Sequence, residues 1–416
     1  MPTRSPRRRE SARHGLALVA GLVSALFGSG AAAHDLTSDP LPDSPGWRVG
    51  AAAAVSWAHS QHTWPAPRWP GFPGSGQTPS SREGASLEHA TLDAAATIGD
   101  RYGAYLAFGQ HGSDQPHTEA ARVEGRWRLD LDTLAVQLGR DRVPMGSALT
   151  SAGHLDRYAQ PPLIKRIALN DDWIDDGLNL RWQRGRAEGL QSVDLGLWTA
   201  RTYPGGSAGR PSPAAHLQAG WGDVSLDLFG AALSPRDRGM PGASLSAGHT
   251  HNQPDCRTSL VGVVCFDGQT RLLGASLSWD PHDWLPVTLT LAGLLQRDSG
   301  ALRSLQGGTA DYRGTTSGGW LDVVWQIDAR WSLGVRAERV SASHDVTGPG
   351  ASLIVTDAGL SPNQPLQRLT GGLTWQPAAG WQLSAEAGSE RGTLPGNRWM
   401  ALRAIWSAPD LIGGRW

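Results

Sequence analysis

The sequence predicts an all-β protein, a transmembrane antiparallel β-barrel of about sixteen strands with short periplasmic turns and long extracellular loops. Three observations lead to this fold class. The chain begins with a segment typical of exported proteins, its short segments alternate apolar and polar residues, and the links between those segments alternate between short and long. Beyond the first segment, no apolar run is long enough for a transmembrane helix.

Residues 1–33 are predicted to be a signal peptide. Several arginines precede the apolar stretch Leu16–Phe27, which is too short to span a bilayer comfortably. Ala31-Ala32-Ala33, directly before His34, forms a small-residue cleavage site. We therefore expect an exported chain that starts at His34, with residues 34–416 forming one barrel domain.

Composition excludes several classes of protein. The 416 residues include 37 Lys and Arg and 38 Asp and Glu, and without the leader 32 basic and 37 acidic residues remain. Nucleic-acid binding by bulk charge is therefore not expected. The 2 cysteines exclude a disulfide-dense scaffold and any Cys-rich zinc or iron–sulfur site.

Strand-like alternation recurs along the chain. Apolar side chains occupy every second position in 47–57, 121–129, 178–182, 273–279 and 400–406. Since a strand points successive side chains to opposite faces, each segment has one apolar and one polar face. Candidate strands start near residues 46, 86, 101, 119, 134, 173, 190, 213, 224, 270, 286, 317, 331, 366, 381 and 397.

The links between these strands differ in length in a regular way. Links after even-numbered strands are short, as at 99–100, 184–189, 280–286, 328–330 and 377–380. Links after odd-numbered strands are mostly long, at about 60–86, 145–172, 235–268, 299–317 and 342–365. This alternation is typical of outer-membrane barrels, and an even strand number leaves both chain ends in the periplasm.

Three predicted hairpins repeat the form aromatic–turn–aromatic. They pair Trp279 with Trp284, Trp325 with Trp331, and Trp375 with Trp381. Because Trp prefers the membrane interface, these pairs predict an aromatic girdle at the periplasmic rim. The alternative is that these tryptophans cap hairpins in an ordinary core.

The predicted barrel encloses water. Closure is required in lipid, since an open edge would leave backbone groups unsatisfied, and sixteen strands enclose more space than side chains fill. The segment between His34 and the first strand is too short for a globular plug. We therefore expect an open, diffusive pore.

Charged residues suggest where such a pore would select its solutes. The link after the fifth predicted strand, 145–172, is the candidate constriction loop, and it carries Arg157, Lys165 and Arg166. Alternation places a ladder of arginines on the lumen wall, at Arg122, Arg126, Arg128 and Arg181. Arg and Lys in a pore lower the barrier for negative solutes, which favours anions, although carboxylates share the lumen and unselective passage is the alternative.

Two segments carry a family resemblance. Residues 136–146 read VQLGRDRVPMG and resemble the passage of phosphate-selective (O and P type) porins in which a Gly-Arg pair leads to Val-Pro-Phe-Gly before the constriction loop. Residues 172–178, DWIDDGL, are similar to the start of that family's next strand. Met145 stands in place of the aromatic residue, Lys165 is the only lysine, and the chain ends in Trp416 rather than Phe. The resemblance implies a trimeric, substrate-selective porin.

Cys256 and Cys265 lie in one long loop of an exported chain, so we expect a disulfide between them. His249 and His251 would point to opposite sides of an extended chain, which suits one metal ion poorly. We therefore predict no metal site, although His59, His62, His111, His117 and His154, all in predicted loops, leave metal capture open as an alternative.

These observations predict a passive porin in the outer membrane of a Gram-negative bacterium. Its expected partners are small hydrophilic solutes or anions and outer-membrane lipid, with no nucleic acid, and the resemblance implies a homotrimer. We expect no cofactor and no enzymatic activity, because no Ser lies in a nucleophile motif and the Gly-rich stretches lack a phosphate-loop pattern. A barrel hydrolase and a non-conducting adhesin or structural barrel are the alternatives.

Overall fold

The computed structural model of the chain describes residues 41–416 except 65–68, 73–80, 113–115, 153–154, 187, 242–255, 257–262, 282–283, 305, 362–363 and 393–394. The predicted signal peptide, 1–33, lies outside the described residues, as do His154, His249 and His251.

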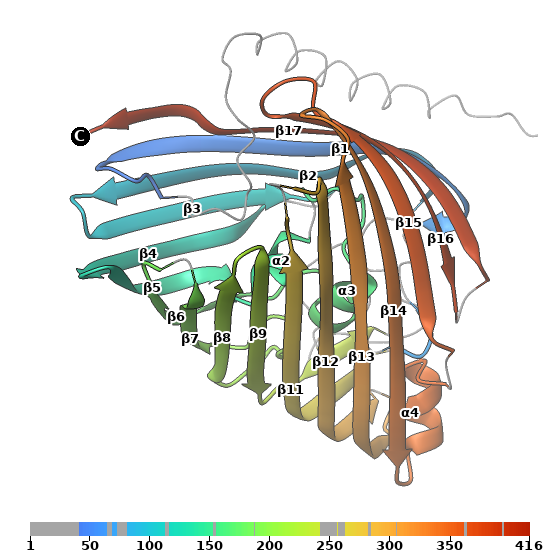
Figure 1. The fold of residues 1–416 in the computed structure, drawn as a ribbon. Coiled ribbons are helices and arrows are strands. Elements are labelled where there is room, and N and C mark those ends of the chain that lie inside the picture. Colours follow the sequence, from blue (N-terminus) through green and yellow to red (C-terminus); the bar gives the residue numbers. More distant parts are fainter. Residues whose placement is uncertain are drawn as a thin grey trace, which may run out of the picture.

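The described residues form one closed antiparallel β-barrel (Figure 1). Consecutive strands pair around the sheet, and β1 closes the barrel by pairing with β17 as well as β2. The strands are β1 Gly46–Trp64, β2 Ser81–Ile98, β3 Tyr102–Gln110, β4 His117–Leu129, β5 Asp132–Arg142, β6 Ile174–Gln183, β7 Gly189–Trp198, β8 Ser212–Trp221, β9 Val224–Leu233, β10 Arg238–Pro241, β11 Val263–Trp279, β12 Val287–Ser304, β13 Thr309–Gln326, β14 Trp331–Thr347, β15 Leu366–Trp375, β16 Trp381–Arg391 and β17 Asn397–Arg415.

The barrel has sixteen positions although the sheet has seventeen strands. The short strand β10 pairs with β11 beyond the point where β9 ends, so β9 and β10 follow one another along the same neighbour. The predicted sixteen-stranded barrel is therefore confirmed, and each predicted strand corresponds to an observed one.

Alternation along the strands separates an apolar outer surface from a polar lumen. Leucines of many strands are exposed on the outside, at Leu92, Leu138, Leu195, Leu273, Leu291, Leu369 and Leu402. Charged side chains on the opposite face are buried inside the barrel, at Arg122, Glu124, Asp194, Asp227, Arg336, Glu338, Glu386 and Arg403. The acyl chains of a bilayer solvate the exposed leucines, and water in the lumen solvates the charged side chains. The barrel therefore has the surface of a protein that spans a lipid bilayer.

The two ends of the barrel differ as the sequence predicts, with one exception. Short turns at the periplasmic end include 99–101, 130–131 and 327–330. The predicted long loop over 299–317 is wrong, because β12 and β13 continue to pair up to Arg303 and Thr309.

The exception has a physical cause in the packing near the extracellular end. The helix α4, Ala351–Asp357, lies in the loop between β14 and β15 and contacts the extended strands (Figure 1). Leu302, Tyr312 and Ile354 are buried together there. The glycines of this stretch favour a loop when the sequence is considered alone. The chain forms strands instead, because the strands cover this small apolar core.

Tryptophans gather at the periplasmic turns. Trp279 and Trp284 lie with their ring centroids 5.6 Å apart. Trp331 stacks on Trp375 of the neighbouring strand rather than on Trp325, again at 5.6 Å.

No helix in the described part of the chain has the length and hydropathy that a bilayer-spanning helix needs.

One loop lies inside the barrel. Residues 143–173, here called the inner loop, join β5 to β6 and contain the helices α2 Ser147–Ser151 and α3 Leu163–Leu169. Both helices lie within the curve of the sheet (Figure 1), and α3 contacts β12, β13 and β14 on the opposite side of the barrel. The loop therefore crosses the lumen.

Candidate functional site

The two segments that resemble the phosphate-selective porins meet at the base of the inner loop. Val143 donates its backbone N–H to the carbonyl oxygen of Trp173 at 2.9 Å, which closes the loop where it leaves the wall. Gly146 has a φ of 97°, and a Cβ there would collide with the side chain of Asp227. Ser147 then donates both its N–H and its hydroxyl to Asp227. The motif thus turns the chain inward.

An apolar patch holds the inner loop against the far wall. Leu163, Ile164 and Ile167 of α3 are buried with Leu294 and Trp320 of the wall strands β12 and β13. This patch is the reason why part of the lumen wall is apolar, against the simple alternation. Burial of several large side chains at about 25 cal/mol per Å² makes it the main force that docks the loop.

Charged wall residues fix the backbone of the loop. Glu338 accepts the N–H of Leu163 at 2.6 Å, and Glu386 accepts the N–H of Ala159 at 2.8 Å. On the same wall, Arg403 donates to the carbonyl oxygen of Asp156 at 2.7 Å. These charged side chains therefore attach the inner loop to the barrel wall. Hydrogen bonds to charged groups are stronger than those between neutral groups.

Lys165 and Arg166, which the sequence predicts as selectivity residues of the constriction loop, do not face the pore. Both side chains are 0% exposed. The Lys165 ammonium is 2.8 Å from a carboxylate oxygen of Asp172, and the Arg166 guanidinium is 3.6 Å from Asp171. Burial lowers the pKa of Lys165, while Asp172 opposes the shift. They are paired because an unpaired buried charge is costly.

Arg157, in contrast, reaches the open space of the barrel. A cavity of about 620 Å³ lies between the inner loop and the wall. Arg157 lines it and donates to the hydroxyls of Ser332 at 2.6 Å and Thr374 at 3.2 Å. Further charged side chains that line the cavity are Arg142, Asp156, Asp322 and Arg336.

Arg336 connects the wall to the loop. Its guanidinium pairs with Asp322 and with Asp156, each at 2.8 Å, and lies over the ring of Tyr158 at 4.3 Å. Alternation along β13 and β14 places Asp322 and Arg336 in the lumen, but it does not reveal the partner Asp156. Arg142 is also missed, because strict alternation ends where β5 turns into the loop.

The predicted arginine ladder lies on the lumen wall with acidic partners. Arg122 is 3.1 Å from Glu124 and 2.9 Å from Asp141. Arg126 also contacts Glu124, and Arg181 lies 2.7 Å from Asp194. The side chains of Arg126 and Arg181 are 30% and 38% exposed, so both face the open lumen.

Arg128 follows Arg122 and Arg126 at alternate positions of β4 and is exposed near the short turn that ends the strand.

At the other end of the barrel, Cys256 and Cys265 form a disulfide with 5.9 Å between their Cα atoms, as the sequence predicts. Cys265 belongs to β11 and is fully buried, so the disulfide ties the preceding loop to the wall.

His216 is a lumenal residue that sequence reasoning misses. Its two ring nitrogens lie 3.1 Å from Asp194 and 3.0 Å from Asp227. Since Asp194 also contacts Arg181 and Asp227 holds Ser147, His216 joins the arginine ladder to the inner loop. In the sequence, only its position on the polar face of β8 indicates that His216 faces the lumen.

Comparison with solved structures identifies the fold. OmpT, an outer membrane protein of Vibrio cholerae, matches with a TM-score of 0.55 at 9% identity, over 90% of this chain and 100% of that one. The outer membrane channel DcaP of Acinetobacter baumannii matches with a TM-score of 0.54 at 9% identity, over 91% and 100%. An anion-selective porin from Comamonas acidovorans matches with a TM-score of 0.50 at 11% identity, over 87% and 99%.

Neither protein-family models nor curated protein sequences give a match. At these identities the structural likeness shows the fold. Together with the apolar outer belt and the closed sheet, it makes the chain an outer-membrane β-barrel with the architecture of the porins.

Proposed function

We propose that the chain is a porin through which small hydrophilic solutes diffuse passively across the outer membrane. The observation that carries this proposal is the cavity of about 620 Å³ inside the closed barrel, lined by polar and charged side chains of both the wall and the inner loop. A loop docked across the lumen narrows the passage without replacing it, since a sixteen-stranded barrel leaves room for water.

The proposed charge preference is for anions, which include phosphate-like solutes. Arg126 and Arg181 expose 30% and 38% of their side chains, against 7% for Arg122 of the same ladder. In the cavity, Arg142, Arg157 and Arg336 outnumber Asp156 and Asp322. Exposed guanidinium groups favour negative solutes, and one structural neighbour is described as an anion-selective porin. The acidic partners of these arginines make the expected preference modest.

The remaining parts of the proposal rest on the sequence. A signal peptide over 1–33 would export the chain, and the resemblance to phosphate-selective porins supports a homotrimer. A trimer form is described for the similar Vibrio cholerae OmpT. The proposal involves no cofactor and no enzymatic step, and 145–172 is the proposed constriction loop.

The pore is tested by reconstitution of the purified chain in a planar bilayer. We expect stepwise conductance increments from single insertions. Absence of conductance together with hydrolysis of ester or lipid substrates would support the barrel hydrolase. Absence of both, with the barrel folded, would support an adhesin or structural barrel.

Anion preference is tested by the reversal potential in a salt gradient. The double variant R126E/R181E replaces two exposed lumenal guanidinium groups by carboxylates, so we expect the potential to shift toward that of a cation-preferring pore. The control R184E/R186E changes charge equally in the short turn after β6. If R126E/R181E leaves the potential unchanged, or R184E/R186E shifts it as much, the arginine ladder does not set the preference.

A further inference from the structure

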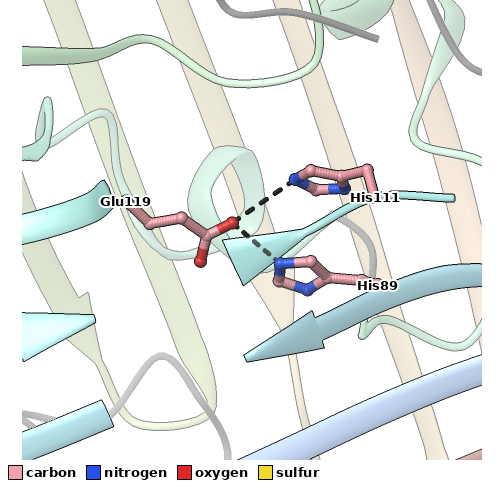
Figure 2. A group of neighbouring side chains, drawn as sticks. All are labelled: His89, His111 and Glu119. Atoms are coloured by element: carbon pink, nitrogen blue, oxygen red, sulfur yellow. Dashed lines mark hydrogen bonds and ion pairs between the residues drawn. The ribbon is translucent and has the colours of Figure 1, made fainter. Parts of the chain in front are cut away.

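Three side chains from separate segments converge at one point of the barrel wall. His89 belongs to β2, His111 follows β3 directly, and Glu119 belongs to β4. Figure 2 shows both imidazole rings turned toward one carboxylate oxygen of Glu119. That oxygen lies 2.7 Å from Nε2 of His89 and 3.4 Å from Nε2 of His111. All three ligand atoms lie within 4.8 Å of one another.

Local irregularities of the sheet build this arrangement. The pairing of β1 with β2 shifts beside His89, and that of β3 with β4 shifts between Ala107 and Phe108, where Glu119 is the extra residue. A bulge redirects side chains that strict alternation would send elsewhere. In addition, Gly109 leaves room for the carboxylate, because a Cβ there would collide with Glu119.

The histidine rings are ordered against one another. His89 and His111 stack with centroids 4.4 Å apart and planes at 12°, and His111 stacks on His117 at 5.2 Å. The side chains of His89 and His111 are 8% and 1% exposed. Stacking and burial hold the rings in fixed orientations, so the nitrogen atoms that face Glu119 are already positioned for an ion.

The donor set determines which metal suits the site. Two imidazole nitrogens and one carboxylate oxygen match zinc and related divalent transition metals, whereas Mg²⁺ and Ca²⁺ require oxygen ligands. With metal–ligand bonds of about 2.0–2.1 Å, donor atoms around a tetrahedral ion lie about 3.4 Å apart. The distance of 3.4 Å from His111 to Glu119 matches this spacing. The 2.7 Å between His89 and Glu119 is a hydrogen-bond distance, so these two side chains would move apart by about 0.7 Å to admit the ion.

We propose that His89, His111 and Glu119 bind one divalent transition-metal ion of the zinc class in the wall of the barrel. His117, whose Nε2 lies 4.0 Å from the same oxygen of Glu119, is placed to supply a fourth ligand. His89 also lines the central cavity, so the ion would be reached from the lumen. The proposal does not depend on solute passage.

The test measures Zn²⁺ binding to the full refolded chain after removal of metal by a chelator. Titration calorimetry is expected to give one Zn²⁺ per chain, unaffected by millimolar Mg²⁺. Co²⁺ is expected to give the visible absorption of a tetrahedral site, and Zn²⁺ to displace it. In E119Q and H111N, Zn²⁺ binding should weaken by at least about tenfold, since even changes in residues behind the ligands cost 10–100-fold.

Two controls separate this site from other histidines. His59 and Glu83 form a matched but exposed pair, 3.7 Å apart, so H59N/E83Q should bind Zn²⁺ as the unaltered chain does. H249N/H251N removes the histidines of the segment 235–268 and should also leave binding unchanged. The heat-dependent gel mobility of folded barrels confirms that each variant is folded.

Two results would overturn the proposal. If the unaltered chain binds no stoichiometric Zn²⁺, the cluster is a hydrogen-bonded His–Glu group only. If folded E119Q and H111N both retain full affinity, the ion is bound elsewhere in the chain.

Discussion

Lys165, the only lysine of the chain, lies fully buried in the inner loop. Its ammonium donates to the carbonyl oxygen of Ala152 at 2.6 Å and to Asp172 at 2.8 Å. Arg142, which is partly exposed, lies 3.3 Å from the same carboxylate group. The sequence suggests that the charge of Lys165 selects solutes, but in the structure this charge stabilises the inner loop. Burying the ammonium without a partner would cost several kcal/mol, so its pairing with Asp172 is required.

This pairing predicts an asymmetric effect of substitutions. D172N leaves the Lys165 ammonium buried without an anionic partner at Asp172, so the free energy of unfolding should fall by roughly 3–5 kcal/mol. K165M/D172N should lose less, because the buried ammonium is removed together with its partner. Urea unfolding in detergent or vesicles measures both.

Asp176 provides the matched control. It belongs to the same stretch of acidic residues, but its side chain is exposed and lies 3.9 Å from Arg140. D176N should therefore change the free energy of unfolding by less than about 1 kcal/mol. An equal loss in D172N and D176N would show that the buried pair is not special.

The inner loop is the element that distinguishes this barrel from an empty cylinder. Its attachment combines the apolar contacts of α3 with hydrogen bonds to wall carboxylates, among them Glu338 and Glu386. The barrel strands do not depend on these contacts for their own backbone hydrogen bonds. The loop can therefore loosen while the barrel stays closed.

Truncation of α3 tests this division. In L163A/I167A, the two side chains that are lost are fully buried, and each such truncation costs about 2–5 kcal/mol. We expect a folded barrel whose inner loop is cleaved faster by protease and whose single-channel current is larger and noisier. L353A, a partly exposed leucine of α4, is the control. Unchanged cleavage and current in L163A/I167A would contradict the proposed attachment.

The whole molecule depends on a barrel that separates lipid outside from water inside. Neighbouring residues of β5 show both sides of this boundary. Leu138 is 58% exposed on the outer surface. Gln137 points inward, where it donates to Glu124 at 2.7 Å.

Two arginine substitutions on β5 compare the lipid-facing side of the barrel wall with its lumenal side. L138R places a charge in lipid and should reduce the free energy of unfolding in vesicles by about 2–4 kcal/mol if the position lies near the bilayer midplane. Q137R places the same side chain in the wet lumen beside Glu124 and should change it much less. Equal effects of L138R and Q137R would contradict the inside–outside assignment.

The sequence by itself determined the strand number, the face that each strand turns to lipid, the disulfide partners and the inner loop as a long link between two strands. These follow from patterns that are local in the chain. Alternation has a period of two residues, and a link between strands is read from its composition and length.

Only the tertiary structure decided which charges meet. Asp156 pairs with Arg336 although 180 positions separate them, and the cluster of His89, His111 and Glu119 depends on two shifts in strand pairing. The extension of β12 and β13 likewise depends on burial beneath α4. Register, bulges and the docking of a loop are set by contacts between distant segments, and no local period records them.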